Sequence, residues 1–304
     1  MNKKCIYFNM HIDRQYNIYY YPMLYHALKT LFQNYDGSFD IIIFQSFIDD
    51  MNFNDYSYLS KYSIIKDFQE IKVIKSEYKE KYKNKEYNDQ VHSPWMSKWH
   101  NLQKVYKMGY KKVFMMDCDV VFFKSPSYIF DKYSSDYVWV LGCVDDVFSY
   151  IYKGKHPIMS GQVLIDFDKI HLPEDFYEQC IEERLKQRSL ANALENKFGS
   201  RAIKNFTFFN EQYSSQIVLE NLGAKYNYLK PCDFTTPANC NLENKAGTHV
   251  YEVNCRNNNI YIENINTCII HYAAGCVGYN LPEHLRDEYL QMSYRNWVKQ
   301  ICHS

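Results

Sequence analysis

Apolar runs alternate along the chain with segments of helical periodicity, and this alternation predicts an α/β protein. The first apolar run is Cys5–Met10, and residues 20–32 follow it with apolar positions at helical spacing. A β-branched and aromatic run, Phe39–Phe44, predicts the next strand. This order of strand, loop, helix and strand is how doubly wound folds begin, and such folds bind nucleotides beyond the carboxyl ends of their strands.

The rest of the chain continues this pattern. Further strands are predicted at 71–75, 113–123, 135–142, 158–167 and 264–272, and further helices at 56–66, 94–108, 173–197 and within a C-terminal segment, 281–304. The helix at 173–197 is expected to be the longest, and a shorter one is expected to begin at its N-cap Asn210 and to end at Gly223. The charged stretch 75–90 is interpreted as a mobile surface excursion. No repeat or linker divides the chain, so we predict one domain, 1–304, with a mostly parallel central sheet.

Composition narrows the class of protein. Hydrophobic residues make up 46% of the chain and charged residues 23%, as in a globular domain. The 35 basic and 35 acidic residues cancel, so no overall field favours a nucleic-acid partner. None of the ten cysteines forms a Cys-x-x-Cys pair, which argues against structural zinc. The sequence has no apolar run of transmembrane length, so we expect no membrane anchor and a cytoplasmic location with reduced cysteines.

The apolar run at 113–123 contains two acids, Asp117 and Asp119, separated only by Cys118. Residues two apart in a strand face the same side, about 6–7 Å apart, and a buried unpaired carboxylate costs several kcal/mol. One hard divalent cation would satisfy both acids, as in a metal–diphosphate site. Alternatively, the strand ends near Met116 and the acids cap a turn. The spacing leaves both interpretations open.

Four pieces together resemble a known family. They are Asp117-Cys118-Asp119, Ser160-Gly161 at the start of a later strand, Glu211-Gln212, and His271-Tyr272-Ala273-Ala274-Gly275-Cys276 after a late strand. In this order they resemble the GT-A glycosyltransferases of family 8, the glycogenin and lipopolysaccharide galactosyltransferase group. The last segment is also similar to His-Phe-Ala-Gly-Cys of family 34. The resemblance runs from about residue 5 to residue 280, and its specific parts are the Asp-x-Asp and the His271 segment.

The resemblance implies a GT-A nucleotide-diphospho-sugar transferase fold and a retaining, metal-dependent glycosyltransferase. Such an enzyme moves a hexose from a UDP-sugar to a hydroxyl of a carbohydrate or glycoprotein acceptor. The implied metal ligands are Asp117, Asp119 and His271, holding Mn²⁺ or Mg²⁺, and the imidazole favours Mn²⁺. A cation bridging the phosphates neutralises the charge of the leaving diphosphate.

The resemblance also assigns residues around the donor. Asp13 and Tyr16 match the spacing of the base- and ribose-binding loop, where Tyr16 would stack on uracil. The remaining candidates for nucleotide, diphosphate and sugar contacts are Asn9, His11, Lys98, Ser160, Gly161 and Gly275. Lys98 would touch the diphosphate, although a solvated helix lysine explains it as well.

Four residues are assigned to the reacting end of the donor. Asp145 or Asp146 would bind donor hydroxyls, and Glu211 with Gln212 would lie near the anomeric carbon. We assign Glu211 to orientation or charge stabilisation rather than nucleophilic attack, because it is one methylene longer than the family's Asp. The structural alternative for this pair is an acid in the first turn of a helix.

The sequence departs from the family pattern at two places. Met159 replaces an Asn before Ser160, and no Lys follows His271 within residues 276–280.

A second Asp-x-Asp, Asp166-Phe167-Asp168, is expected at the opposite edge of the sheet. The acceptor site is expected around residues 231–262. A nucleotidyltransferase, and a catalytically degenerate nucleotide-binding or scaffolding protein of the same fold, are the competing hypotheses.

Overall fold

A central sheet of seven strands organises the chain. The computed structural model describes residues 3–12, 20–47, 71–82, 91–141, 145–235, 252–256, 259–263, 265–271 and 279–280. The strands of the central sheet are β1 (Lys4–Ile12), β2 (Asp40–Phe47), β3 (Ile71–Lys75), β4 (Lys112–Met116), β6 (Tyr137–Leu141), β7 (Ile158–Asp166) and β8 (Tyr226–Tyr228). Their order is β3-β2-β1-β4-β7-β6-β8, and only β7 runs antiparallel to its neighbours. The prediction of an α/β fold with a mostly parallel sheet is confirmed.

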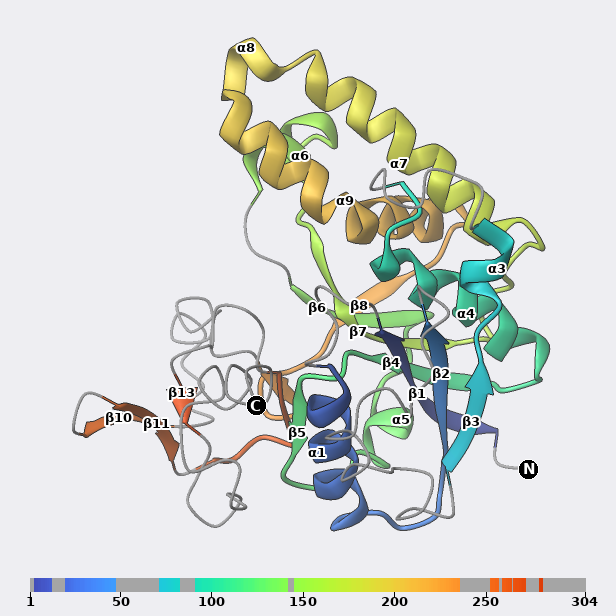
Figure 1. The fold of residues 1–304 in the computed structure, drawn as a ribbon, viewed down its shortest axis with the longest axis vertical. Coiled ribbons are helices and arrows are strands. Elements are labelled where there is room, and N and C mark those ends of the chain that lie inside the picture. Colours follow the sequence, from blue (N-terminus) through green and yellow to red (C-terminus); the bar gives the residue numbers. More distant parts are fainter. Residues whose placement is uncertain are drawn as a thin grey trace.

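Helices pack on both faces of this sheet (Figure 1). One face is covered by α1 (Tyr20–Phe32) and α5 (Ile129–Lys132), and the other by α3 (Tyr78–Tyr82), the short 3₁₀ helix η3 (Pro94–Met96), α4 (Ser97–Lys107), α7 (Phe176–Asn192) and α9 (Ser200–Asn221). Alternation along β1 explains the two layers: Ile6 and Phe8 pack with Leu28 of α1, whereas Tyr7 packs with Trp99 of α4. Because both faces are buried, the parallel strands appear in the sequence as continuous apolar runs.

Helices α7 and α9 form a long hairpin that extends beyond the sheet, with α8 (Glu195–Phe198) at its tip and α6 (Asp146–Ile151) packed against it (Figure 1). Gly199, with φ of +82°, separates α8 from α9. The predicted boundaries here were wrong. Asn210 lies in the middle of α9, which has 22 residues and is longer than α7 with its 17. Propensity could not reveal this, because polar residues in the second half of α9, such as Asn210, Glu211 and Gln216, are buried against other parts of the protein.

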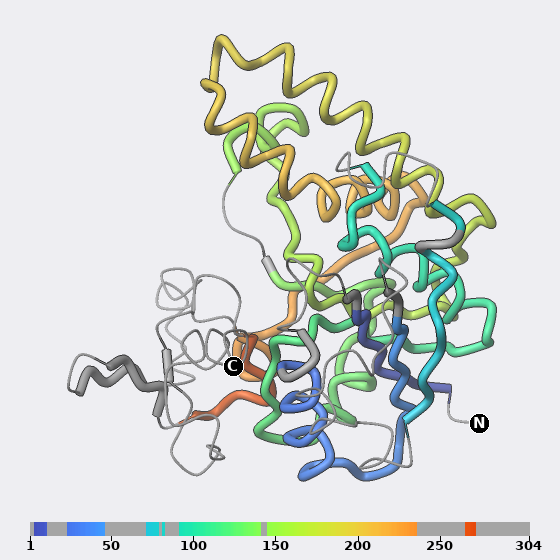
Figure 2. Tube along the Cα trace, viewed as in Figure 1, coloured from blue at the N-terminus to red at the C-terminus, as the bar shows by residue number. Residues whose placement is uncertain are grey.

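Two small sheets complete the described part. One contains β5 (Val120–Phe122), β9 (Phe234–Thr235) and β12 (Ile269–His271), and the other contains β10 (Glu252–Arg256), β11 (Asn259–Glu263) and β13 (Tyr279–Asn280). Strand β12 pairs antiparallel with β5, so segments about 150 residues apart in sequence run side by side (Figure 2). In this register His271 lies opposite Val120, the residue directly after Asp119.

Two further predictions differ from the structure. The predicted strand at 113–123 is divided into β4 and β5, with Asp117, Cys118 and Asp119 in the turn between them. Part of the predicted surface excursion is helix α3, whose Tyr78 and Tyr82 are buried in the core. The predicted helix at 56–66 and the C-terminal helix lie outside the described residues. Among the described helices, none is both long and apolar enough to cross a bilayer.

Candidate metal and nucleotide-sugar site

Strand β4 ends at Met116 because the chain turns there to begin β5 in a different sheet. The last contact with β7 is the backbone N–H of Asp117, which donates to the carbonyl of Gly161 at 2.7 Å. Beyond this point the chain no longer follows the pleat of the strand. The two acids therefore lie in a turn rather than on one face of a strand, which is the alternative that the sequence left open. The turn still brings both carboxylates to the carboxyl end of β4.

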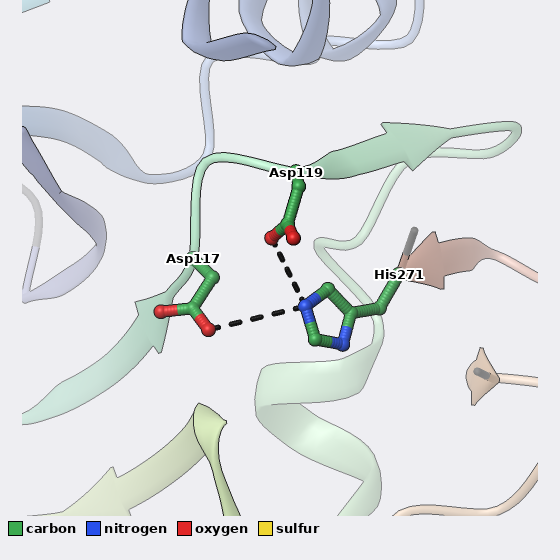
Figure 3. Close-up of side chains that lie close together, drawn as sticks. All are labelled: Asp117, Asp119 and His271. Atoms are coloured by element: carbon green, nitrogen blue, oxygen red, sulfur yellow. Dashed lines mark hydrogen bonds and ion pairs between the residues drawn. The ribbon is translucent and has the colours of Figure 1, made fainter. Parts of the chain in front are cut away.

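The side chains of Asp117, Asp119 and His271 converge on one point (Figure 3). Nε2 of His271 lies 3.0 Å from Oδ1 of Asp119 and 3.9 Å from Oδ2 of Asp117. One ligand atom from each residue lies within 4.8 Å of the other two. Ligand atoms bound about 2.0–2.2 Å from one ion are about 3 Å apart in adjacent positions and just over 4 Å apart in opposite ones. The donor set and its spacing therefore fit one divalent cation after a small closure.

The acids set the protonation of the imidazole. Burial acts to lower the pKa of His271, but the charge of Asp119, its hydrogen bond and the charge of Asp117 outweigh it, so the pKa is raised above its ordinary value. An imidazole held between two carboxylates binds either a proton or a cation at Nε2. A cation bound there takes the place of the proton in balancing the acids.

Gly161 allows Asp117 to approach β7 closely. A Cβ atom at position 161 would lie 2.3 Å from Oδ2 of Asp117 and 3.4 Å from Cε1 of His271. A side chain of any size would therefore occupy the space that the carboxylate uses. The close approach, rather than an unusual backbone conformation, explains a glycine here.

Lys98 extends from α4 into the same site. Its side chain is buried, with a residue exposure of 6%. Its Nζ donates to the Oγ of Ser160 at 3.1 Å and to the Ser160 carbonyl at 3.3 Å, and lies 3.5 Å from Oδ1 of Asp117. The interpretation of Lys98 as a solvated helix residue is wrong. A buried ammonium group next to a carboxylate is positioned to meet the negative charge of a bound diphosphate.

Ser160 connects this lysine to helix α9. Its Oγ hydrogen-bonds Oε1 of Glu211 at 3.3 Å, and its backbone N–H donates to Oε1 of Gln212 at 3.1 Å. Burial raises the pKa of Glu211, while the cations of Lys98 and Arg184 oppose this rise. Among the described residues, Oε2 of Glu211 has no hydrogen-bond partner although it is buried. The alternative of an acid in the first turn of a helix is wrong, because Glu211 lies in the middle of α9.

Of the residues predicted to bind the base and ribose at the end of β1, only Asn9 has a described side chain. It lies on β1 one position beyond Phe8, which pairs with Met116, so it is next to the Asp117 turn. Its Oδ1 accepts from Nδ2 of Asn101 at 2.7 Å, and its carbonyl accepts from the Sγ of Cys118. The side chain of His11, together with Asp13, Tyr16 and Gly275, lies outside the described residues, and their roles stay predictions.

Asp145 and Asp146 are held differently. Oδ1 of Asp145 caps α6 by accepting from the N–H of Phe148 at 2.9 Å, and its Oδ2 accepts from the hydroxyl of Tyr213 at 3.0 Å. Asp146 is exposed in the first turn of α6. Both carboxylate oxygens of Asp145 thus form hydrogen bonds within the protein. The assignment of Asp145 to the donor sugar stays a prediction.

The second Asp-x-Asp lies at the opposite edge of the sheet, as expected. Asp166 pairs with Lys112, the first residue of β4, and its Oδ1 accepts from the N–H of Asp168. Asp166 therefore caps the turn that follows β7. Lys111 pairs with Asp168 at 2.9 Å. These acids are separated from the metal-like cluster by the length of β4.

Three residues that support the site were not singled out from the sequence. Asn101 orients Asn9; Gln216 accepts from the N–H of Ile158 and so fixes the start of β7; Arg184 donates to Oδ1 of Asn210, next to Glu211. The sequence contained a signal that Asn101 and Gln216 support the site, since each lies three or four residues from a predicted site residue on the same helix. Arg184 had none, because its contact joins two helices.

Comparison with other proteins places the fold. Neither a protein-family model nor a curated protein matches the sequence. Solved structures do match. One is mouse xyloside xylosyltransferase 1 in its apo form, which matches with a TM-score of 0.53 and 10% identity over 90% of this chain and 98% of that chain. An active-site variant of LgtC matches with a TM-score of 0.51, 12% identity and coverage of 98% and 95%. At these identities the likeness establishes the fold, which is that of the GT-A glycosyltransferases.

Proposed function

We propose that this chain is a retaining, metal-dependent glycosyltransferase that moves a hexose from a UDP-sugar to a hydroxyl of a carbohydrate or glycoprotein. The observation that carries this proposal is the convergence of Asp117, Asp119 and His271 at the carboxyl end of β4. The fold supports it, because this edge of a doubly wound sheet is where nucleotides bind. Fold alone would not license an activity, so the proposal depends on the site.

The three side chains would hold Mn²⁺ or Mg²⁺, and the imidazole among them favours Mn²⁺. A divalent cation bound there supplies Lewis acidity, which stabilises negative charge on a leaving diphosphate. Lys98 would add a second, fixed positive charge from the opposite side of Asp117. We infer that Lys98 replaces the family lysine that is absent after His271.

The donor sugar would lie over the start of β7. Ser160 is held there by Lys98 and Glu211. In a retaining reaction the acceptor enters on the side from which the diphosphate leaves. Glu211 and Gln212 would then face the opposite side of the anomeric centre, where a carboxylate stabilises positive charge that develops on the sugar.

Release of UDP from a panel of UDP-hexoses and UDP-N-acetylhexosamines tests this proposal. With Mn²⁺ present, we expect UDP release from at least one donor, and we expect EDTA to abolish it. Release of pyrophosphate from a nucleoside triphosphate and a sugar phosphate would instead indicate a nucleotidyltransferase. Absence of both activities, with UDP still bound, would indicate a degenerate nucleotide-binding protein.

A further inference from the structure

Two exposed aromatic side chains lie a few residues before Lys98 and Glu211 of the candidate site. Trp95 in η3 and Phe208 in α9 are 39% and 48% exposed, although the centres of their rings are only 4.9 Å apart. Their planes meet at 67°, an edge-to-face arrangement that leaves ring surface open to solvent. An exposed apolar patch, unlike a single exposed ring, can mark a binding site.

This aromatic pair is directly continuous with the site. Trp95 precedes Lys98 by three residues, and Phe208 precedes Glu211 by three and Gln212 by four. Phe208, Glu211 and Gln212 share helix α9, where residues three and four apart are neighbours with about 5–6 Å between their Cβ atoms; Trp95 lies in η3, directly before α4. Lys98 and Glu211 both contact Oγ of Ser160. Lys98 of α4 and Glu211 of α9 thus meet at Ser160, and the aromatic rings that precede each of them along the chain also meet.

We propose that Trp95 and Phe208 form the subsite for the sugar ring of a saccharide acceptor. This inference rests on the proposed function, and it places an acceptor subsite outside residues 231–262, where the sequence led us to expect the acceptor site. A pyranose has an apolar C–H face that packs on an aromatic ring, while its hydroxyls stay available to solvent or to the reaction. The pair would place an acceptor hydroxyl one helical turn from the reacting centre.

The reaction balances without any further reactant. The bond between the anomeric carbon and the phosphate oxygen breaks, and both electrons leave with UDP. The acceptor hydroxyl oxygen forms the new bond to the anomeric carbon. Its proton passes to the departing phosphate oxygen. The aromatic pair takes no part in these steps and acts only by positioning the acceptor.

The test compares two activities of the same protein. UDP release from the active donor is measured first without acceptor, which reports hydrolysis, and then with lactose, maltose or cellobiose, which reports transfer. Variants Trp95→Ala and Phe208→Ala remove the rings, and Trp95→Phe and Phe208→Tyr restore them. Tyr150→Ala is the matched control, because Tyr150 is an exposed aromatic residue on α6 that contacts neither ring.

We expect the alanine variants to raise KM for the best saccharide at least 10-fold, with kcat and hydrolysis nearly unchanged, and the aromatic variants to recover most of the loss. An unchanged KM in both alanine variants would overturn the inference. So would hydrolysis that no saccharide accelerates, or a change in oligomeric mass without a change in KM. Loss of hydrolysis in the parent protein itself would instead count against the proposed function.

Discussion

Replacing Gly161 with alanine tests the site with the smallest possible change. The added Cβ would lie 2.3 Å from Oδ2 of Asp117, whereas ordinary contacts begin near 3.4 Å. The carboxylate oxygen must therefore retreat by about 1 Å, and it can do so because the Asp117 side chain is 37% exposed. A displacement of this size at a reacting centre costs about 100-fold in rate. We expect Gly161→Ala to weaken Mn²⁺ binding at least 10-fold and to lower the rate of UDP release about 100-fold.

The fold should tolerate this change. Gly161 does not have a positive φ, so alanine fits its backbone, and we expect the free energy of unfolding to change by no more than about 1 kcal/mol. Gly199→Ala is the control, because we expect it to lower the free energy of unfolding and to leave Mn²⁺ binding unchanged. Its φ of +82° and ψ of 152° disfavour a side chain by about 1–3 kcal/mol, while nothing lies near its Cβ. Mn²⁺ titrations and urea unfolding measure both effects. Undiminished Mn²⁺ affinity in Gly161→Ala would refute the placement of Asp117.

Three further predictions address other parts of the site and the fold. Lys98→Met should leave Mn²⁺ binding equal or tighter, since a nearby cation is removed, but should weaken binding of UDP with Mn²⁺ about 10-fold; calorimetry distinguishes the two. Asp145→Ala should lower the free energy of unfolding by about 1–2 kcal/mol, and Asp145→Asn should restore most of it, because the amide still caps α6; equal losses in urea unfolding would contradict this. Burial and the charge of Lys81 lower the pKa of His100 to about 4. Below pH 6.5 the imidazole is therefore protonated in the unfolded chain before it is protonated in the folded protein, and the free energy of unfolding falls as the pH drops towards 4. His100→Phe should flatten this fall, by at most about 3 kcal/mol at pH 4, in denaturation curves.

The sequence predicted the framework of the fold because local patterns determine it. Helix α1 and strand β3 were predicted with their observed bounds, since apolar positions at helical spacing mark the helix and three β-branched residues mark the strand. The length of α9 was missed because Asn210, Glu211 and Gln216 resemble surface or capping residues in the sequence. In the structure they are buried by contacts with α7 and β7. Tertiary contacts, which a pattern of single residues does not encode, decide where such a helix begins.

In the site, too, some features were predictable from local sequence patterns and others depend on tertiary contacts. The residue types and chain order predicted the cluster of Asp117, Asp119 and His271, but not the way it forms. Extended geometry would have spread the two acids along a strand, whereas the turn after Met116 and the pairing of β12 with β5 bring them together. The burial of Lys98 depended on the distance between α4 and β7, which no spacing in the sequence reports.

Binding of Mn²⁺ to the protein with and without UDP, followed by electron paramagnetic resonance, tests the central claim most directly. We expect one tightly bound ion in the parent protein, with an affinity that rises when UDP is added. The double variant Asp117→Asn, Asp119→Asn should lose this ion, and Asp166→Asn, at the opposite edge of the sheet, should keep it. One bound ion of unchanged affinity in the double variant would contradict the account.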